Sequence, residues 1–214
     1  MRTIKHHLTQ ELILGYAAGT LPEAVNLAVA THVSLCDECR AAVEAHEAVG
    51  GSVIERCGTE DMSAGARDNA LAAIRGAAPE VPAAPTPDAV LPAPILSYVG
   101  KGLSDVKWRP VGMGVKQAIL PTSSGATARL LYIPAGVAMP DHSHNGMELT
   151  LVLKGAFEDE DGRFARGDIE IADDAVQHTP VADISEDCIC LAVTDAPLRF
   201  KGLLPRLAQP FLKI

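Results

Sequence analysis

A proline-rich stretch divides the chain into two parts with different patterns. Six prolines fall within residues 79–94, namely Pro79, Pro82, Pro85, Pro87, Pro92 and Pro94. Because proline fixes φ and removes a backbone donor, this stretch is expected to form neither a helix nor a central strand. We therefore predict a linker at 79–94 joining two semi-independent domains at 1–78 and 95–214, with a long loop inside one domain as the alternative.

The part before the linker has the pattern of a small all-α bundle. We expect four helices, beginning near Thr9, Pro22, Asp37 and Ser63. The third should be interrupted or kinked at Gly50-Gly51. The only aromatic residue here is Tyr16, so the core is thin, and a bound metal is one way to stabilise such a bundle.

The part after the linker alternates apolar and polar residues with a period of two. The clearest segments are 130–133, 148–153, 168–171 and 188–193. Clusters of Gly, Pro and Asp separate them. Many short strands of this kind predict an all-β barrel or jelly roll. The expected fold class is therefore an α-helical bundle followed by a β-barrel.

The charge and the termini of the sequence exclude several classes. The formal net charge is −9, with −4 on residues 1–78 and −5 on 79–214, which opposes binding to a phosphate backbone by overall charge. No segment has the apolar length of a membrane span, and the first residues do not resemble a signal peptide. We therefore expect a cytoplasmic protein. Its five cysteines are too few for a disulfide scaffold.

The first chemical cluster is His32, Cys36 and Cys39. His32 lies four residues before Cys36, and Cys39 three after it. On a helix or across a helix junction, these spacings allow all three side chains to reach one point. Thiolates and imidazoles suit tetrahedral Zn²⁺, and a closed structural site needs a fourth ligand. The candidates are His6 and His7, and after them His46 and Cys57. The alternative is a Cys-x-x-Cys redox pair beside an unrelated histidine.

The second cluster is formed by His142, His144, Glu148 and His178. His142 and His144 lie two apart on an extended segment, so they share a face. Three imidazoles and one carboxylate suit Zn, Fe, Mn, Ni or Cu and leave positions open for water or a ligand. Cys188 and Cys190 also share a strand face. They are either a thiol pair near this metal or small core residues.

The N-terminal motif resembles the zinc-binding anti-sigma domain over about residues 5–75. An upstream histidine followed by His-x-x-x-Cys-x-x-Cys is typical of that family, and its spacing fits His7 better than His6. The resemblance implies a Zn²⁺ held by His7, His32, Cys36 and Cys39. It also implies that three helices surround the metal and that the fourth helps to grip a sigma factor.

The second motif resembles the cupin family over about residues 95–195. The pattern Gly-x5-His-x-His-x3-Glu-x6-Gly is matched throughout residues 136–155, and Gly167 and His178 match the second cupin motif. Asp173, Ala175 and Ala182 stand where Pro, Gly and Asn are usual. The resemblance implies a jelly-roll barrel with a divalent metal on His142, His144, Glu148 and His178. Zn²⁺ is the first choice and Fe, Mn or Ni the alternatives, and a barrel that has kept the spacing without a metal also stays open.

The order of the two domains is similar to that of the ChrR-type anti-sigma factors. This resemblance implies a regulator, not an enzyme, that binds an extracytoplasmic-function sigma factor as a 1:1 heterodimer, without direct contact to DNA or a membrane. A signal such as singlet oxygen would release the sigma factor, with the cupin as the sensing or release module. Two alternatives remain: a metal-dependent cupin oxygenase or isomerase with an accessory zinc domain, and a zinc-dependent DNA-binding module.

Overall fold

The computed structural model describes residues 3–76, 88–140, 142–143, 146–172, 177–196 and 199–200, with the backbone alone at 142–143, 177–178 and 199–200. The helices are α1 (Gln10–Ala17), α2 (Glu23–Val33), α3 (Asp37–Glu55), α4 (Ala66–Gly76) and α5 (Ala93–Val99), followed by a 3-10 turn, η1 (Leu103–Asp105). The strands are β1 (Arg109–Gly112), β2 (Val115–Ile119), β3 (Thr127–Ile133), β4 (His142–Ser143), β5 (Glu148–Lys154), β6 (Ala156–Asp159), β7 (Gly162–Ala165), β8 (Ile169–Ala172), β9 (Gln177–His178), β10 (Val181–Ala182), β11 (Cys188–Thr194) and β12 (Arg199–Phe200).

The first four helices begin close to the expected positions. The Thr9 side chain caps α1 by accepting a hydrogen bond from the Leu12 amide at 3.4 Å, and Pro22 precedes α2. The expected interruption at Gly50-Gly51 is wrong, because α3 continues through both residues. A glycine inside a helix costs only about 1 kcal/mol, which a 19-residue helix can tolerate.

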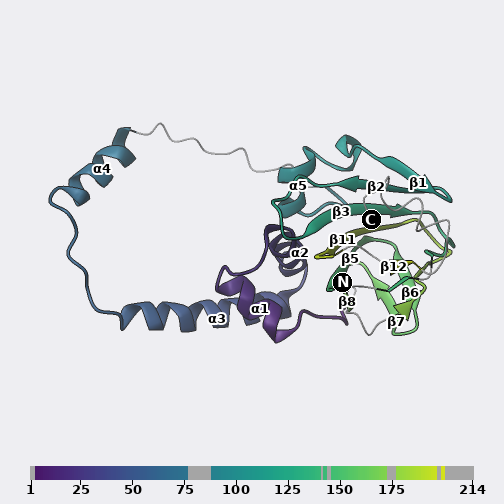
Figure 1. Cartoon of the computed structure of the whole chain (residues 1–214), viewed down its shortest axis with the longest axis horizontal. Coiled ribbons are helices and arrows are strands. Elements are labelled where there is room, and N and C mark those ends of the chain that lie inside the picture. Colours follow the sequence, from purple (N-terminus) through teal and green to yellow (C-terminus); the bar gives the residue numbers. More distant parts are fainter. Residues whose placement is uncertain are drawn as a thin grey trace.

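The strands form an antiparallel barrel, and the four strands predicted from alternation are confirmed as β3, β5, β8 and β11. A six-stranded sheet has the order β1-β2-β3-β11-β5-β8. Two three-stranded sheets, β10-β6-β7 and β12-β4-β9, complete the domain (Figure 1). The fold is therefore a small helical unit joined to an antiparallel β-barrel, as the sequence predicts.

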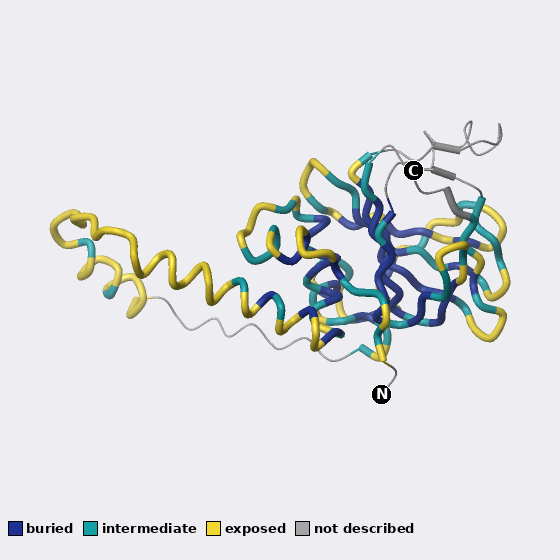
Figure 2. The backbone as a smooth tube through the Cα atoms, turned by 90° about the horizontal axis from the view of Figure 1, so that it is seen from below, coloured by how far each residue is buried: buried dark blue, intermediate teal, exposed yellow. Residues whose placement is uncertain are grey.

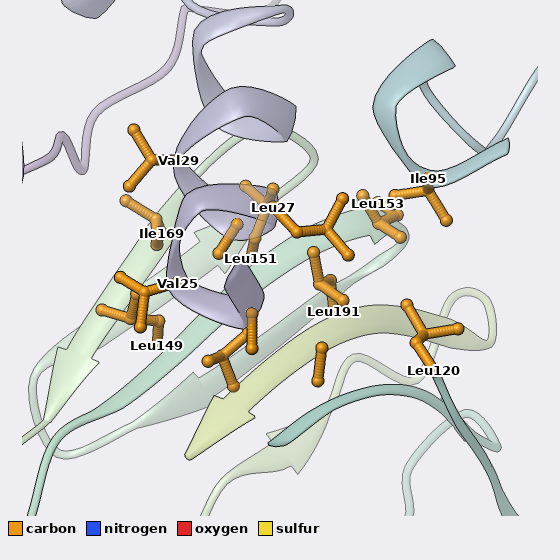
Figure 3. Close-up of a cluster of buried hydrophobic side chains, with 14 of the residues drawn as sticks. Val25, Leu27, Val29, Ile95, Leu120, Leu149, Leu151, Leu153, Ile169 and Leu191 are labelled. Carbon is orange, nitrogen blue, oxygen red and sulfur yellow. The ribbon is translucent and has the colours of Figure 1, made fainter. Parts of the chain in front are cut away.

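Helix α2 lies on the outer face of the large sheet, where it contacts β3, β5 and β11. Figure 3 shows the apolar side chains at this contact, among them Val25, Leu27, Val29, Leu149, Leu151 and Leu191. Because α2 covers one face and the barrel interior the other, every residue of β11 is buried. The helices and the sheet thus share one hydrophobic cluster. Two semi-independent domains would be expected to have separate clusters.

The end of the proline-rich stretch is folded against this cluster. Asp88 accepts hydrogen bonds from the amides of Val90 and Leu91, and the Leu91 side chain is buried. The expectation that residues 79–94 contain no helix is wrong at their end, because α5 begins at Ala93 with Pro94 in its first turn. Proline is tolerated there since the first amides of a helix have no partner within it. The rest of the linker prediction falls largely on 77–87, outside the described residues.

The second half of α3 and all of α4 extend away from the body of the molecule (Figure 1). Both segments are exposed along their length (Figure 2), and α4 has no buried residue. Within the described part of the chain, no helix combines the length and the apolar character needed to cross a membrane.

Candidate functional site

The N-terminal cluster is built from three short pieces of backbone. His7 lies in the extended segment that precedes the Thr9 cap of α1. His32 is in the last turn of α2, and the chain turns at residues 34–35 to begin α3. Cys36 caps α3 and Cys39 follows in its first turn, so the α2–α3 junction places three of the four side chains together.

The distances within this cluster suit a tetrahedral metal ion. His7 Nδ1 lies 3.3 Å from Cys36 Sγ and 3.7 Å from Cys39 Sγ, while His32 Nε2 lies 3.3 Å from Cys39 Sγ. One atom from each of the four residues falls within 4.8 Å of the others. Bonds of about 2.0–2.3 Å from one Zn²⁺ place tetrahedral neighbours about 3.3–3.8 Å apart, so these donors fit the ion with little movement.

Burial sets the charge states of His32 and Cys39 in this cluster. Burial, helped by the nearby His7, lowers the pKa of His32 to about 4, so its ring is neutral and able to bind a metal at pH 7. Burial raises the pKa of the Cys39 thiol to about 11. A divalent cation would supply the positive charge that a buried thiolate needs.

One carboxylate lies beside the His7 ring. Its Nε2 lies 3.5 Å from an oxygen of Glu38, which leaves Nδ1 facing the two sulfur atoms. Carboxylates that hold the second nitrogen of a ligating histidine fix its orientation and raise its basicity. Glu38 was not predicted from the sequence, although its position between the two cysteines was an available signal.

The structure separates the two adjacent candidates for the fourth position. His7 faces the cysteines, whereas the His6 ring stacks on Phe164 with centroids 4.2 Å apart and lies 3.4 Å from Asp168. The later candidates stay outside the cluster, since His46 bonds to the Ala42 carbonyl and Cys57 is exposed. The grouping thus matches the predicted His7, His32, Cys36 and Cys39 set, and metal binding by it remains a prediction.

The second predicted cluster is described only in part. Glu148 opens β5, is buried, and accepts a hydrogen bond from the Thr150 hydroxyl at 3.1 Å. The backbones of His142 in β4 and His178 in β9 occupy directly paired positions of an antiparallel ladder. The side chains of these two histidines and all of His144 lie outside the described residues, so this metal site stays a prediction.

A buried guanidinium beside Glu148 was not predicted. Arg129 lies on β3 between Ala128 and Leu130, which belong to the cluster under α2, so Arg129 points to the barrel interior. Its Nη2 donates to the Thr194 hydroxyl at 3.4 Å. Burial lowers its pKa and the Glu148 charge raises it. An arginine at an inward position of an otherwise apolar strand was the available signal.

The paired cysteines of β11 lie inside the barrel. Their sulfur atoms are 3.4 Å apart, and both side chains are buried without a disulfide. Each belongs to the apolar cluster of the interior with Val152 and Phe157. The hydrogen bond between the Cys190 and Cys188 thiols and the burial of Cys190 both raise the pKa of the Cys190 thiol, which keeps it in the less reactive form. These facts favour the interpretation as core residues.

Comparison with known proteins gives consistent matches along the chain. Residues 99–198 match the family model of the ChrR cupin-like domain. The anti-sigma-E factor ChrR of Cereibacter sphaeroides is 55% identical over 212 residues, covering 99% of this chain and 100% of that protein. The crystal structure of Rhodobacter sphaeroides SigE in complex with the anti-sigma ChrR aligns with a TM-score of 0.80 and 54% identity, over 90% of this chain and 100% of that one.

Proposed function

The chain belongs to the ChrR family of anti-sigma factors, and we propose that it binds an extracytoplasmic-function sigma factor in a 1:1 complex in the cytoplasm and keeps it inactive until a signal arrives. The observation that carries this proposal is the identity of 55% over 99% of the chain. The matched relative is a regulator, so the metal-dependent enzyme that the cupin spacing left open is not retained.

The exposed half of α3 and the whole of α4 form the surface best suited to the sigma factor. Together with the segment between them, these helices form an arm whose large apolar side chains are more than half exposed, namely Val49, Val53, Ile54, Met62 and Ile74. No residue of α4 is buried within the described part of the chain. An apolar surface of this extent marks an interaction site, and a partner would bury it between its own segments.

Charged substitutions on this arm test the proposal. Val53→Asp with Ile74→Asp places two carboxylates on the arm without touching a buried residue. Ile184→Asp is the control, because Ile184 is also an exposed apolar residue, 86% exposed, but lies on a cupin loop. We expect the double variant to bind the sigma factor at least ~10-fold more weakly, about 1.4 kcal/mol, and the control to bind as the wild type does. Equal affinity of all three proteins in titration calorimetry would contradict this surface.

The metal sites have different roles in this proposal. Zn²⁺ at the N-terminal cluster is structural, because it ties α2 to α3 and to the segment before α1. A divalent metal in the cupin belongs to the sensing module, which responds to singlet oxygen or a related oxidant. Release requires that the signalled state bind the sigma factor less well than the resting state. The direct contact of α2 with β3, β5 and β11 supports transmission from the barrel to the helices.

A further inference from the structure

We infer that the β7–β8 turn of the cupin domain, residues 165–169, positions a ligand of the N-terminal metal site. In this inference Asp168 is a positioning residue for His7. The inference rests on the proposed zinc site and adds a dependence of that site on the other domain. It therefore concerns what holds the ligands in place, not which residues they are.

Asp168 holds the backbone immediately before His7. One carboxylate oxygen accepts hydrogen bonds from the amides of Lys5 at 2.6 Å and His6 at 3.0 Å. The His6 carbonyl in turn accepts a bond from the Ile169 amide at 3.4 Å. Three hydrogen bonds from one turn of the cupin thus fix the two residues that precede the ligand. Charge-assisted bonds to a buried carboxylate are the strong ones, so this segment is held firmly.

The cupin turn and the segment before α1 lie close together. A Cβ atom on Gly167, whose φ is +92°, would lie 2.7 Å from the Ile4 side chain and 4.0 Å from Leu35 at the α2–α3 junction. Glycine is therefore required here both by its conformation and by the contact. The segment before α1, the α2–α3 junction and the cupin turn meet at one place.

This turn is also joined to the predicted cupin metal site. Asp168 immediately precedes β8, and Ala172 at the far end of β8 pairs with Glu148 of β5. A strand is stiff along its length and spans about 13 Å over four residues. A displacement at the Glu148 end would consequently move Asp168 and loosen the hold on His7. The two predicted metal sites are thus linked by one strand.

Two variants and a matched control test the inference in the full-length protein. Asp168→Ala removes the acceptor, which also serves the Ala165 amide of its own turn. Lys5→Pro removes one donor and leaves the cupin sequence intact. Asp187→Ala is the control, because Asp187 likewise accepts a backbone bond in a cupin turn, from Ala135 at 3.0 Å, but contacts the Tyr132 hydroxyl instead of the N-terminal segment.

The measurement uses cobalt in place of zinc. Thiolate-bound Co²⁺ has a charge-transfer absorption that a site of histidines and a carboxylate lacks, so this band reports the N-terminal cluster alone. Its loss in Cys36→Ser assigns the band. We expect Asp168→Ala and Lys5→Pro to release cobalt to a chelator at least ~10-fold faster than the wild type, which matches the lower end of the affinity lost when groups that support a metal ligand are removed. Asp187→Ala should release it at the wild-type rate.

The possible results distinguish a failure of this inference from a failure of the zinc proposal on which it rests. A wild-type rate in both Asp168→Ala and Lys5→Pro would overturn the role of the turn while leaving the metal site in place. Equal acceleration by Asp187→Ala would also overturn it, since the effect would then come from general loss of cupin stability. If the wild type shows no thiolate band at all, the zinc proposal itself fails and the inference falls with it.

Discussion

Replacing Leu151 by alanine should weaken the packing of α2 on the sheet. Leu151 is fully buried on the face of β5 that packs against α2 (Figure 3). The change removes three methylene equivalents at about 0.8 kcal/mol each, or about 2.4 kcal/mol. The cavity that remains raises the cost to about 3–4 kcal/mol, inside the range of about 2–5 kcal/mol for buried leucines. Since that loss falls on the contact with α2, the opening of this helix becomes at least ~100-fold more frequent.

Hydrogen exchange of the α2 amides measures this opening directly. Val152→Ala is the control, because Val152 is the next residue of β5, equally buried, but it faces the barrel interior. We expect the buried amides of α2 to exchange at least ~100-fold faster in Leu151→Ala and to change much less in Val152→Ala. Unchanged exchange in Leu151→Ala would refute the shared core. So would an equal effect of the control, because exchange would then report unfolding of the whole sheet.

Three further predictions concern the metal ligands and the paired cysteines of β11. Cys36→Ser with Cys39→Ser should remove the N-terminal metal, lower the helicity measured by circular dichroism and abolish sigma binding, because metal-binding energy becomes folding energy; full binding by the metal-free double variant would contradict a structural role. Glu148→Ala, like alanine variants of His142, His144 and His178, should leave sigma binding intact without stress but weaken release, measured as sigma-dependent reporter output with a generator of singlet oxygen. Cys188→Ser with Cys190→Ser should have a smaller effect in that assay, and a normal response of all four ligand variants would move the sensor to Cys36 and Cys39.

Local patterns predicted the elements and the ligand types of this protein. Helix caps such as Thr9 and the period-two alternation act over a few residues, so they can be recognised in the sequence. The spacing of His32, Cys36 and Cys39 is also local, since one helix junction carries all three. The α5 helix was missed because a rule about proline inside helices was applied to a first turn, where proline is tolerated.

The choice between His6 and His7 shows what the local pattern leaves open. The two residues are adjacent in an extended segment, so nothing in their spacing decides which faces the cysteines, and only family resemblance favoured His7. The cupin decides it in the structure, because Phe164 and Asp168 hold His6 on their side. No sequence signal joins Asp168 to residues that are 162 positions away.

The sequence by itself determined the order of the helical and β parts, the two ligand motifs and the family. Only the tertiary structure decided that α2 covers the sheet and that the cupin turn reaches the N-terminal cluster. The physical reason is the range of the forces. Capping, alternation and ligand spacing depend on neighbours along the chain, whereas the burial of β11 on both faces depends on a helix more than 150 residues earlier. Contacts of that kind follow from how the apolar surfaces of distant segments fit together, and composition does not encode that fit.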